Sequence, residues 1–256
     1  MREAITPLII TYNEAANLRR TLEKLTWASD IVVVDSFSTD STLEIAGAFP
    51  QVRVIQRPFD HFANQCNFGL EHCRSNWVLS LDADYVLSGG LIAELHDWVP
   101  EAEVNAYFSR FVYCVFGRPL RGSLYPPRPI LFRRNCCHYY QDGHAHALRI
   151  EGRVGRLKNI VFHDDRKSLA HWMGAQVRYS TLEIEKLART RPDQLSLPDR
   201  IRRRIFLAPL LVFFYTLIGK GLIFDGWAGW FYVFQRTLAE LLISLRLLEA
   251  GQLQNS

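Results

Sequence analysis

The sequence predicts an α/β fold with a doubly wound parallel sheet, followed by a region of amphipathic helices. Short apolar runs alternate with segments that carry leucines at helical spacing. The run at residues 31–34 is apolar on both faces, which is typical of a strand buried between two layers of helices. Strands that alternate with helices form right-handed βαβ units, and such units build a parallel sheet.

The first half contains four expected strands, at residues 7–11, 31–34, 52–55 and 77–81. We expect Asn13 to cap a helix after the first strand and a residue among 38–40 to cap a second helix. A third helix is expected at 62–73. Further on, Ser88 is expected to cap a helix that reaches Val99. Later strands are expected at 106–116, 130–132 and 160–162.

Composition narrows the classes of protein. With 256 residues, 48% apolar and 22% charged, the chain is ordinary for a globular protein, and a net charge of +4 is too small to indicate nucleic-acid binding. The five cysteines form no C-x-x-C pair, which favours reduced thiols. No secretory signal is recognisable at the N-terminus, and no apolar run reaches the roughly 18 residues of a spanning helix. We therefore expect a cytoplasmic location.

Two common nucleotide motifs are absent. The sequence has no G-x-G-x-x-G after the first strand and no G-x-x-x-x-G-K-[ST], which argues against a dinucleotide-binding domain and a P-loop NTPase. Instead, Asp82 and Asp84 follow the fourth strand two residues apart and can face one crevice at the carboxyl edge of the sheet. Two close carboxylates fit Mg²⁺ or Mn²⁺ together with a substrate diphosphate. A solvated turn is the plain alternative.

Polar groups at three strand ends, residues 11–14, 35–40 and 82–84, together resemble the N-terminal half of family 2 glycosyltransferases over residues 4 to about 98. The resemblance implies a GT-A fold, a Rossmann-like mixed sheet that binds a nucleotide-diphospho-sugar. It implies that Asp84 ligates the metal directly. The implied nucleotide-pocket residues are Thr11, Glu14, Asp35, Arg57, Asn67 and Asp82. Cys66 departs from the pattern, because many relatives have a basic residue there. Taken singly, Asp35 also fits a helix cap and Arg57 a surface charge.

A catalytic base is expected at Asp142. Sugar transfer with inversion needs one general base for the acceptor hydroxyl, and an Asp-Gly turn can project a carboxylate into a pocket. The resemblance places an acidic residue here, in a bacterial subgroup that has Asp-Gly-His. Lipopolysaccharide-core transferases often show a His-Glu pair nearby, where this chain has His146 and Ala147. A plain turn residue is the alternative for Asp142, and a loop role is the alternative for His144 and His146.

The segment 163–167 is the second charged candidate. His163 can complete the metal shell, and Arg166 and Lys167 can neutralise the leaving diphosphate. The alternative is a charged loop that enters a helix capped by Ser168.

The C-terminal third suggests a membrane surface. An amphipathic helix is expected at 168–190, and four arginines within 200–204 precede an apolar run at 205–218. A Trp- and Leu-rich stripe follows at 227–245. We expect a helix pair in the headgroup region, with the arginines against anionic lipid. A core or dimer helix pair is the alternative. The expected domains are a catalytic domain at 1–167, with nucleotide-binding (1–98) and acceptor (99–167) halves, and a helical region at 168–256.

Together these features predict a metal-dependent, inverting glycosyltransferase, peripheral on the inner face of the cytoplasmic membrane. Its donor is taken to be a UDP-sugar, and its acceptor a lipid-linked or cell-envelope glycan. A polyprenyl-phosphate sugar synthase and a non-catalytic nucleotide-sugar-binding scaffold are the alternatives. We expect no nucleic-acid partner.

Overall fold

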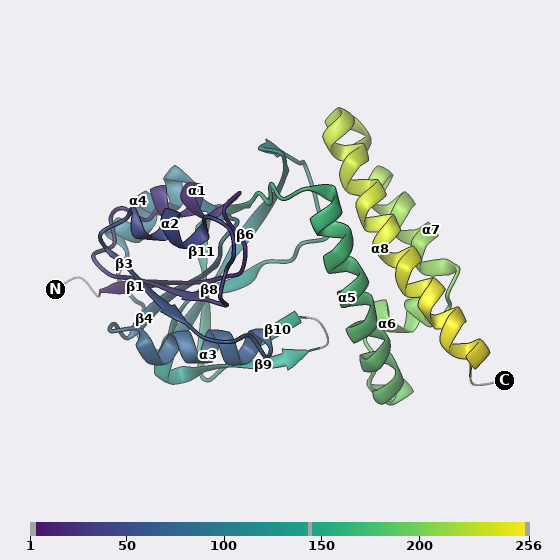
Figure 1. Cartoon of the computed structure of the whole chain (residues 1–256), viewed down its shortest axis with the longest axis horizontal. Helices are drawn as coiled ribbons and strands as arrows, with labels where there is room; N and C mark the ends of the chain where they lie inside the picture. The colour runs from purple at the N-terminus through teal and green to yellow at the C-terminus, as the bar shows by residue number, and fades with distance from the viewer. Residues whose placement is uncertain (1–3, 143–144, 254–256) are drawn as a thin grey trace. The chain divides into compact units, whose positions relative to one another are not determined.

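A computed structural model describes residues 4–142 and 145–253 (Figure 1). The chain divides into two compact units. The first, called the sheet unit, comprises Met1–Gly117, Tyr125–Gln141 and His146–Arg166. The second, called the helical unit, comprises Arg118–Leu124, Asp142–Ala145 and Lys167–Ser256.

The sheet unit begins with four parallel strands in the order β3-β2-β1-β4. Their bounds are Ile5–Thr11 for β1, Ile31–Asp35 for β2, Val52–Gln56 for β3 and Trp77–Asp82 for β4. The register pairs Thr11 with Asp35 across β1 and β2, and Ile10 with Asp82 across β1 and β4. All four strands confirm the prediction, because apolar residues predominate in each of them.

The rest of the sheet is mixed, as the GT-A fold implied by the resemblance predicted. Strand β8 (Arg128–Arg133) lies antiparallel between β4 and β6 (Val104–Val115). Strand β11 (Arg153–His163) runs parallel to β6, and the short β5 (Tyr85–Leu87) runs antiparallel to β11. These directions bring the carboxyl ends of β1, β2, β4, β6 and β11 to one edge, together with the starts of β5 and β8. We call this the ligand edge.

Two apolar cores cover the two faces of the sheet. Alternate strand residues face opposite ways: Ile9, Ile31 and Val33 pack in one core, and Leu8, Val32 and Val34 in the other. The first core includes residues of α1 (Leu18–Glu23), α2 (Thr42–Gly47) and α4 (Gly89–Asp97). The second includes residues of α3 (Phe62–His72). Figure 1 shows α3 on the face opposite the other three helices.

Two predicted helix caps have different outcomes. Ser88 caps α4 as predicted, because its Oγ accepts from the Leu91 amide. The cap at Asn13 is wrong, since α1 begins only at Leu18. Asn13 instead has a left-handed φ of 54°, and its side-chain oxygen accepts from the Thr39 amide at 2.8 Å.

The sheet unit also holds a short 3-10 turn, η1 (Arg134–Cys136), and a hairpin that the sequence did not reveal. Strands β9 (Cys137–Asp142) and β10 (Ala145–Ile150) form this separate two-stranded sheet.

The helical unit contains three longer helices and several short segments. Helix α8 (Gly226–Leu253) packs against α5 (Leu169–Arg189) and α7 (Leu207–Phe214). The remaining elements are β7 (Arg118–Pro119), η2 (Pro192–Gln194), α6 (Leu197–Arg202), η3 (Tyr215–Gly219) and η4 (Leu222–Asp225). Among the described residues no single helix is long and apolar enough to cross a membrane, but Leu207–Gly219 and Leu222–Gly251, bent by 68°, meet the length and composition criterion as a pair.

Helix α8 buries polar as well as apolar residues and exposes large apolar ones. Its inward residues include the buried Glu240 and Ser244, whereas Trp227, Phe234 and Leu245 on its outer side are 48%, 57% and 61% exposed. The apolar stripe expected at 227–245 is therefore present, and it faces outward. Whether this side meets a membrane or another protein stays a prediction.

The expected lipid role of the arginine cluster is wrong for Arg202. This side chain points into the helical unit and pairs with Glu240 at 2.8 Å, Asp199 at 3.3 Å and Glu183 at 3.4 Å. Two other arginines act as backbone caps. Arg200 donates to the Leu195 carbonyl, and Arg203 to the Leu187 carbonyl at the end of α5.

Candidate functional site

At the ligand edge, the ends of β1 and β2 are joined by a buried hydrogen bond. Thr11 Oγ1 donates to Asp35 Oδ1 at 3.0 Å, and Asp35 has no exposed surface. The Asp35 carboxylate also accepts from the Ser38 amide at 2.9 Å and from Gln56 at 3.3 Å. The structure thus brings together two predicted nucleotide residues, and their contact with a base stays a prediction.

Two exposed aromatic residues flank this pair, and the sequence analysis did not single them out. Tyr12 and Phe37 are 55% and 51% exposed, and each directly follows or nearly follows a strand end. Phe37 has a left-handed φ of 60°. Asn13, which follows Tyr12, also has a left-handed φ, of 54°. Exposed aromatic rings are stacking platforms for nucleobases. In the sequence, the signal for these stacking platforms would have been an aromatic residue close to the Thr or Asp that ends a strand.

Asp82 is the last residue of β4 and Asp84 lies in the turn that follows it, so their common orientation stays a prediction. Both are half-buried, whereas Leu81, Ala83 and Tyr85 between and beside them are buried. Asp84 Oδ2 lies 3.1 Å from Nε2 of His163, the last residue of β11. The structure therefore joins two of the three predicted metal ligands across 79 residues of chain.

His163 sits among tyrosine rings. The ring centroids of Tyr85, Tyr113 and Tyr125 lie 5.3, 4.7 and 4.6 Å from its imidazole. Burial alone would lower the pKa of His163, but the negative charge of Asp84, its hydrogen bond, and the charge of Asp82 outweigh burial and raise that pKa. Its Nδ1 is buried and has no hydrogen-bond partner among the described residues.

Arg128, at the start of β8, is a site residue that the sequence analysis passed over. It donates to the Tyr125 hydroxyl at 3.1 Å, and the Tyr125 hydroxyl is hydrogen-bonded to that of Tyr85. Burial opposes the charge on Arg128, yet the nearby Tyr125, Tyr85 and Asp82 raise its pKa. Burial, with the Asp82 charge, raises the pKa of Tyr125 to about 12. In the sequence, the available signal was an arginine within the proline-rich stretch at residues 125–129.

The donor atoms of Asp84 and His163 suit a cation whose remaining ligands come from the substrate. Within residues 4–142 and 145–253, no three His, Cys, Asp or Glu side chains are placed to hold a metal ion. Asp84 and His163 do touch, and the orphaned Nδ1 shows that the imidazole lacks a full set of partners. Because Mg²⁺ binds through one or two protein groups plus phosphate oxygens and water, this pair is compatible with such an ion.

The charged segment after His163 is tied to α1. Asp164 is 5% exposed and binds Arg20 at 2.6 Å and Arg166 at 2.9 Å. Asn17 donates to Asp165 at 2.8 Å and to Glu14 at 2.9 Å. Asp164 thus has a structural role that the sequence analysis did not foresee. The Arg166 guanidinium, expected at the diphosphate, rests on Asp164 and is 43% exposed.

Two other predicted nucleotide residues make protein contacts. Arg57 pairs with Asp60 at 2.8 Å, which lowers the Asp60 pKa, and its amide donates to the Asp35 carbonyl at 3.0 Å. The Asn67 carboxamide donates to and accepts from the Tyr139 backbone, at 2.9 and 3.0 Å, and so holds β9. Contact of either residue with a nucleotide stays a prediction.

The remaining predicted residues are only partly described. Asp142 ends β9, but its side chain and that of His146 lie outside the described part of the structure, as does His144 entirely. Lys167 begins the third segment of the helical unit. The roles of Asp142 and Lys167 therefore stay predictions.

Comparisons with known proteins agree with this architecture. The family model for glycosyl transferase family 2 matches residues 7–147. A lipopolysaccharide core biosynthesis glycosyltransferase, LpsC of Rhizobium meliloti, is 32% identical over 136 residues, which cover 51% of this chain and 48% of LpsC. An uncharacterized glycosyltransferase of Rickettsia bellii is 35% identical over 96 residues, 37% of this chain and 32% of the relative.

These alignments span half or less of the length of the curated relatives. Among solved structures, residues 1–349 of TarS from S. aureus, in complex with UDP-GlcNAc, match with a TM-score of 0.49 and 13% identity, over 93% of this chain and 90% of that one. The family model covers more than half of the 256 residues and includes the ends of β1, β2 and β4, but not His163 at the end of β11. With its mixed α/β sheet of the GT-A class, the chain belongs to glycosyl transferase family 2.

Proposed function

We propose that this protein transfers a sugar from a nucleotide-sugar donor, a UDP-sugar, to a lipid-linked or cell-envelope glycan, with inversion at the anomeric carbon. The observation that carries the proposal is the ligand edge, where the Thr11–Asp35 pair and the Asp84–His163 pair both lie. The first pair is suited to the nucleoside and the second to the diphosphate end. LpsC, to which this chain is similar, is a lipopolysaccharide core biosynthesis glycosyltransferase, and a cell-envelope acceptor is consistent with that role.

In this mechanism the chain's own groups position charge around the breaking bond. Tyr12 offers a ring to the base, and Asp84 and His163 would hold a divalent cation, with Asp82 beside them. When bound, Mg²⁺ or Mn²⁺ supplies positive charge to the leaving diphosphate. Arg128, whose pKa is raised by its neighbours, stays protonated and adds to that positive field, as would Arg166 and Lys167. Asp142 takes the proton of the acceptor hydroxyl.

Donor turnover tests the proposal. We would incubate the protein with a panel of nucleotide sugars, each with Mn²⁺ and with EDTA, and measure release of free nucleotide. We expect slow, metal-dependent release from one donor and its loss in Asp84→Asn. The exposed Asp97 provides the matched control, since Asp97→Asn removes a carboxylate remote from this edge. Equal turnover of Asp84→Asn and Asp97→Asn would refute the assigned metal role.

The acceptor is tested with the same assay after a membrane lipid extract is added. Stimulated transfer that disappears in Asp142→Ala supports a hydroxyl acceptor and a general base. Transfer that persists in Asp142→Ala favours a polyprenyl phosphate acceptor, which needs no strong base. Donor binding without release, even with the extract, would favour a non-catalytic scaffold.

We further propose that the protein is peripheral on an anionic membrane, through the outward apolar side of α7, η3, η4 and α8. Support comes from the exposed fractions of Phe206, Ile218 and Phe224, which are 73%, 65% and 74%. Vesicle flotation tests this. Replacing Ile218 and Phe224 by Ser should release the protein from vesicles. Replacing Val99, 75% exposed in the sheet unit, by Ser should not. Equal flotation of both variants would refute the membrane surface.

A further inference from the structure

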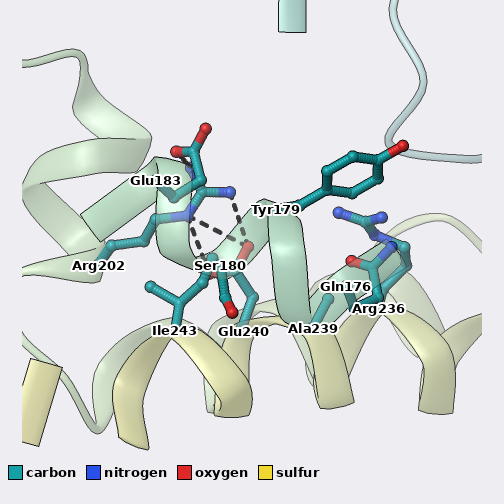
Figure 2. Close-up of a pocket in the computed structure, with 9 residues that line it drawn as sticks. All are labelled: Gln176, Tyr179, Ser180, Glu183, Arg202, Arg236, Ala239, Glu240 and Ile243. Atoms are coloured by element: carbon teal, nitrogen blue, oxygen red, sulfur yellow. Dashed lines mark hydrogen bonds and ion pairs between the residues drawn. The ribbon is translucent and has the colours of Figure 1, made fainter. Parts of the chain in front are cut away.

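A cavity of about 120 Å³ lies inside the helical unit, between α5 and α8 (Figure 2). Polar side chains dominate its lining. Gln176, Tyr179 and Glu183 come from α5, Arg236 and Glu240 from α8, and Arg202 from the end of α6. Since about 10–15 Å³ of such space holds one water, the cavity accepts a group of several heavy atoms but no nucleotide sugar.

Charged side chains pair with one another at one end of this cavity. Arg202 bonds Glu240 at 2.8 Å and Glu183 at 3.4 Å, and the dashed lines in Figure 2 mark these contacts. Asp199 is shared by Arg202 at 3.3 Å and Lys186 at 3.6 Å. Three carboxylates thus share two cations, which leaves an excess of one negative charge among these five groups. The carboxylates that line the cavity are therefore already engaged.

Arg236 lines the cavity without such a partner. Within the described residues it makes no hydrogen bond or ion pair, and its Nε is buried and unpaired. Figure 2 shows it reaching the cavity from α8 with no dashed line to it. A buried, unpaired donor on a charged group is costly, so its retention indicates a missing partner.

The missing partner is an oxyanion. A guanidinium presents a planar fork of donors that matches phosphate oxygens in a bidentate way. Gln176 adds a carboxamide in the same lining. The same helix that brings Arg236 inward exposes Trp227 and Phe234 on its other side.

We propose that this cavity binds a phosphate group through Arg236, either free in solution or as the headgroup of an anionic lipid. The residues of this site are different from those of the ligand edge, and phosphate binding here does not depend on sugar transfer. If the wild-type protein turns over its donor but does not bind phosphate, this inference is refuted and the proposed function stands. Loss of turnover with phosphate binding intact would do the reverse.

Phosphate binding is measured on the full chain in an uncharged detergent. We would follow the melting temperature against inorganic phosphate, with chloride at matched ionic strength, since a ligand of the folded state raises that temperature. We expect a saturable rise with phosphate only. Arg236→Gln should weaken binding at least about tenfold, because a charged hydrogen bond is lost. Arg204, exposed on the same unit, gives the control Arg204→Gln, which should change binding less than about twofold.

Vesicles then separate the two sources. Stronger flotation on phosphatidate-containing than on pure phosphatidylcholine vesicles, lost in Arg236→Gln, assigns a lipid headgroup. A response to inorganic phosphate without that preference assigns a free ion. If phosphate and chloride act alike on the wild type, or if Arg236→Gln matches Arg204→Gln in both assays, the site is refuted. Should Arg236→Gln fail to fold, the wild-type comparison decides alone.

Discussion

Replacing Asp164 by Asn should lower the free energy of unfolding of the sheet unit by more than the small size of the change suggests. Asp164 is 5% exposed and receives Arg20 at 2.6 Å, Arg166 at 2.9 Å and the Gly117 amide at 2.9 Å. Asn can still accept from Gly117, but it cannot neutralise two guanidinium groups. Leaving one partner of a buried ion pair uncompensated costs about 3–5 kcal/mol.

Urea unfolding measures this loss. With a slope of about 2–3 kcal/mol/M, the unfolding midpoint should fall by roughly 1–2.5 M in Asp164→Asn. The control is Arg153→Gln, which removes an exposed ion pair with Glu103 at 3.8 Å and should cost about 0–1 kcal/mol. A midpoint for Asp164→Asn within the range of Arg153→Gln would show that the contacts of Asp164 do not stabilise the fold.

Three further changes test other parts of the chain. Glu240→Gln should lower the free energy of unfolding by about 1.5–3 kcal/mol, since it removes the closest charged acceptor of Arg202; an unchanged urea midpoint contradicts this. Gly229→Ala should lower the melting temperature, because its Cβ would lie 2.0 Å from a backbone carbonyl oxygen, whereas Gly174→Ala in α5 has room and should raise it. Burial raises the pKa of Cys73 to about 12, so its native alkylation should stay slow up to pH 10; rapid labelling contradicts this.

The sign of the Cys73 effect on stability follows from the same shift. The unfolded thiol ionises above a pKa of about 8.5, whereas the buried thiol stays protonated to about pH 12. The unfolded state alone therefore gains from deprotonation as the pH rises. Stability contributed at this site is complete below about pH 8.5 and declines above it. A Cys73→Ala variant should show a shallower decline between pH 8.5 and 10.

Sequence reasoning found the parallel strands because apolar residues predominate in each of them. It missed the extent of β11, whose first residues, Arg153 and Val154, are exposed and whose pattern is half polar. Its spacing argument for Asp82 and Asp84 assumed an extended chain, whereas β4 ends at Asp82 and residues 83–84 form a turn. It missed the role of Asp164, because its partner Arg20 lies 144 residues away and only the fold brings them together. It also misjudged Arg202, since a run of arginines gives no sign of which one is turned inward.

The position of β11 limits which fragments of this chain can fold. The strand lies between β6 and β5, yet it begins at Arg153, beyond the 7–147 segment that carries the family signature. A protein truncated after residue 147 would leave β6 with a bare edge of unpaired amides and carbonyls, which invites pairing between chains. It would also lose His163. The smallest autonomous version of the sheet unit must therefore extend at least to Arg166, and shorter fragments should aggregate.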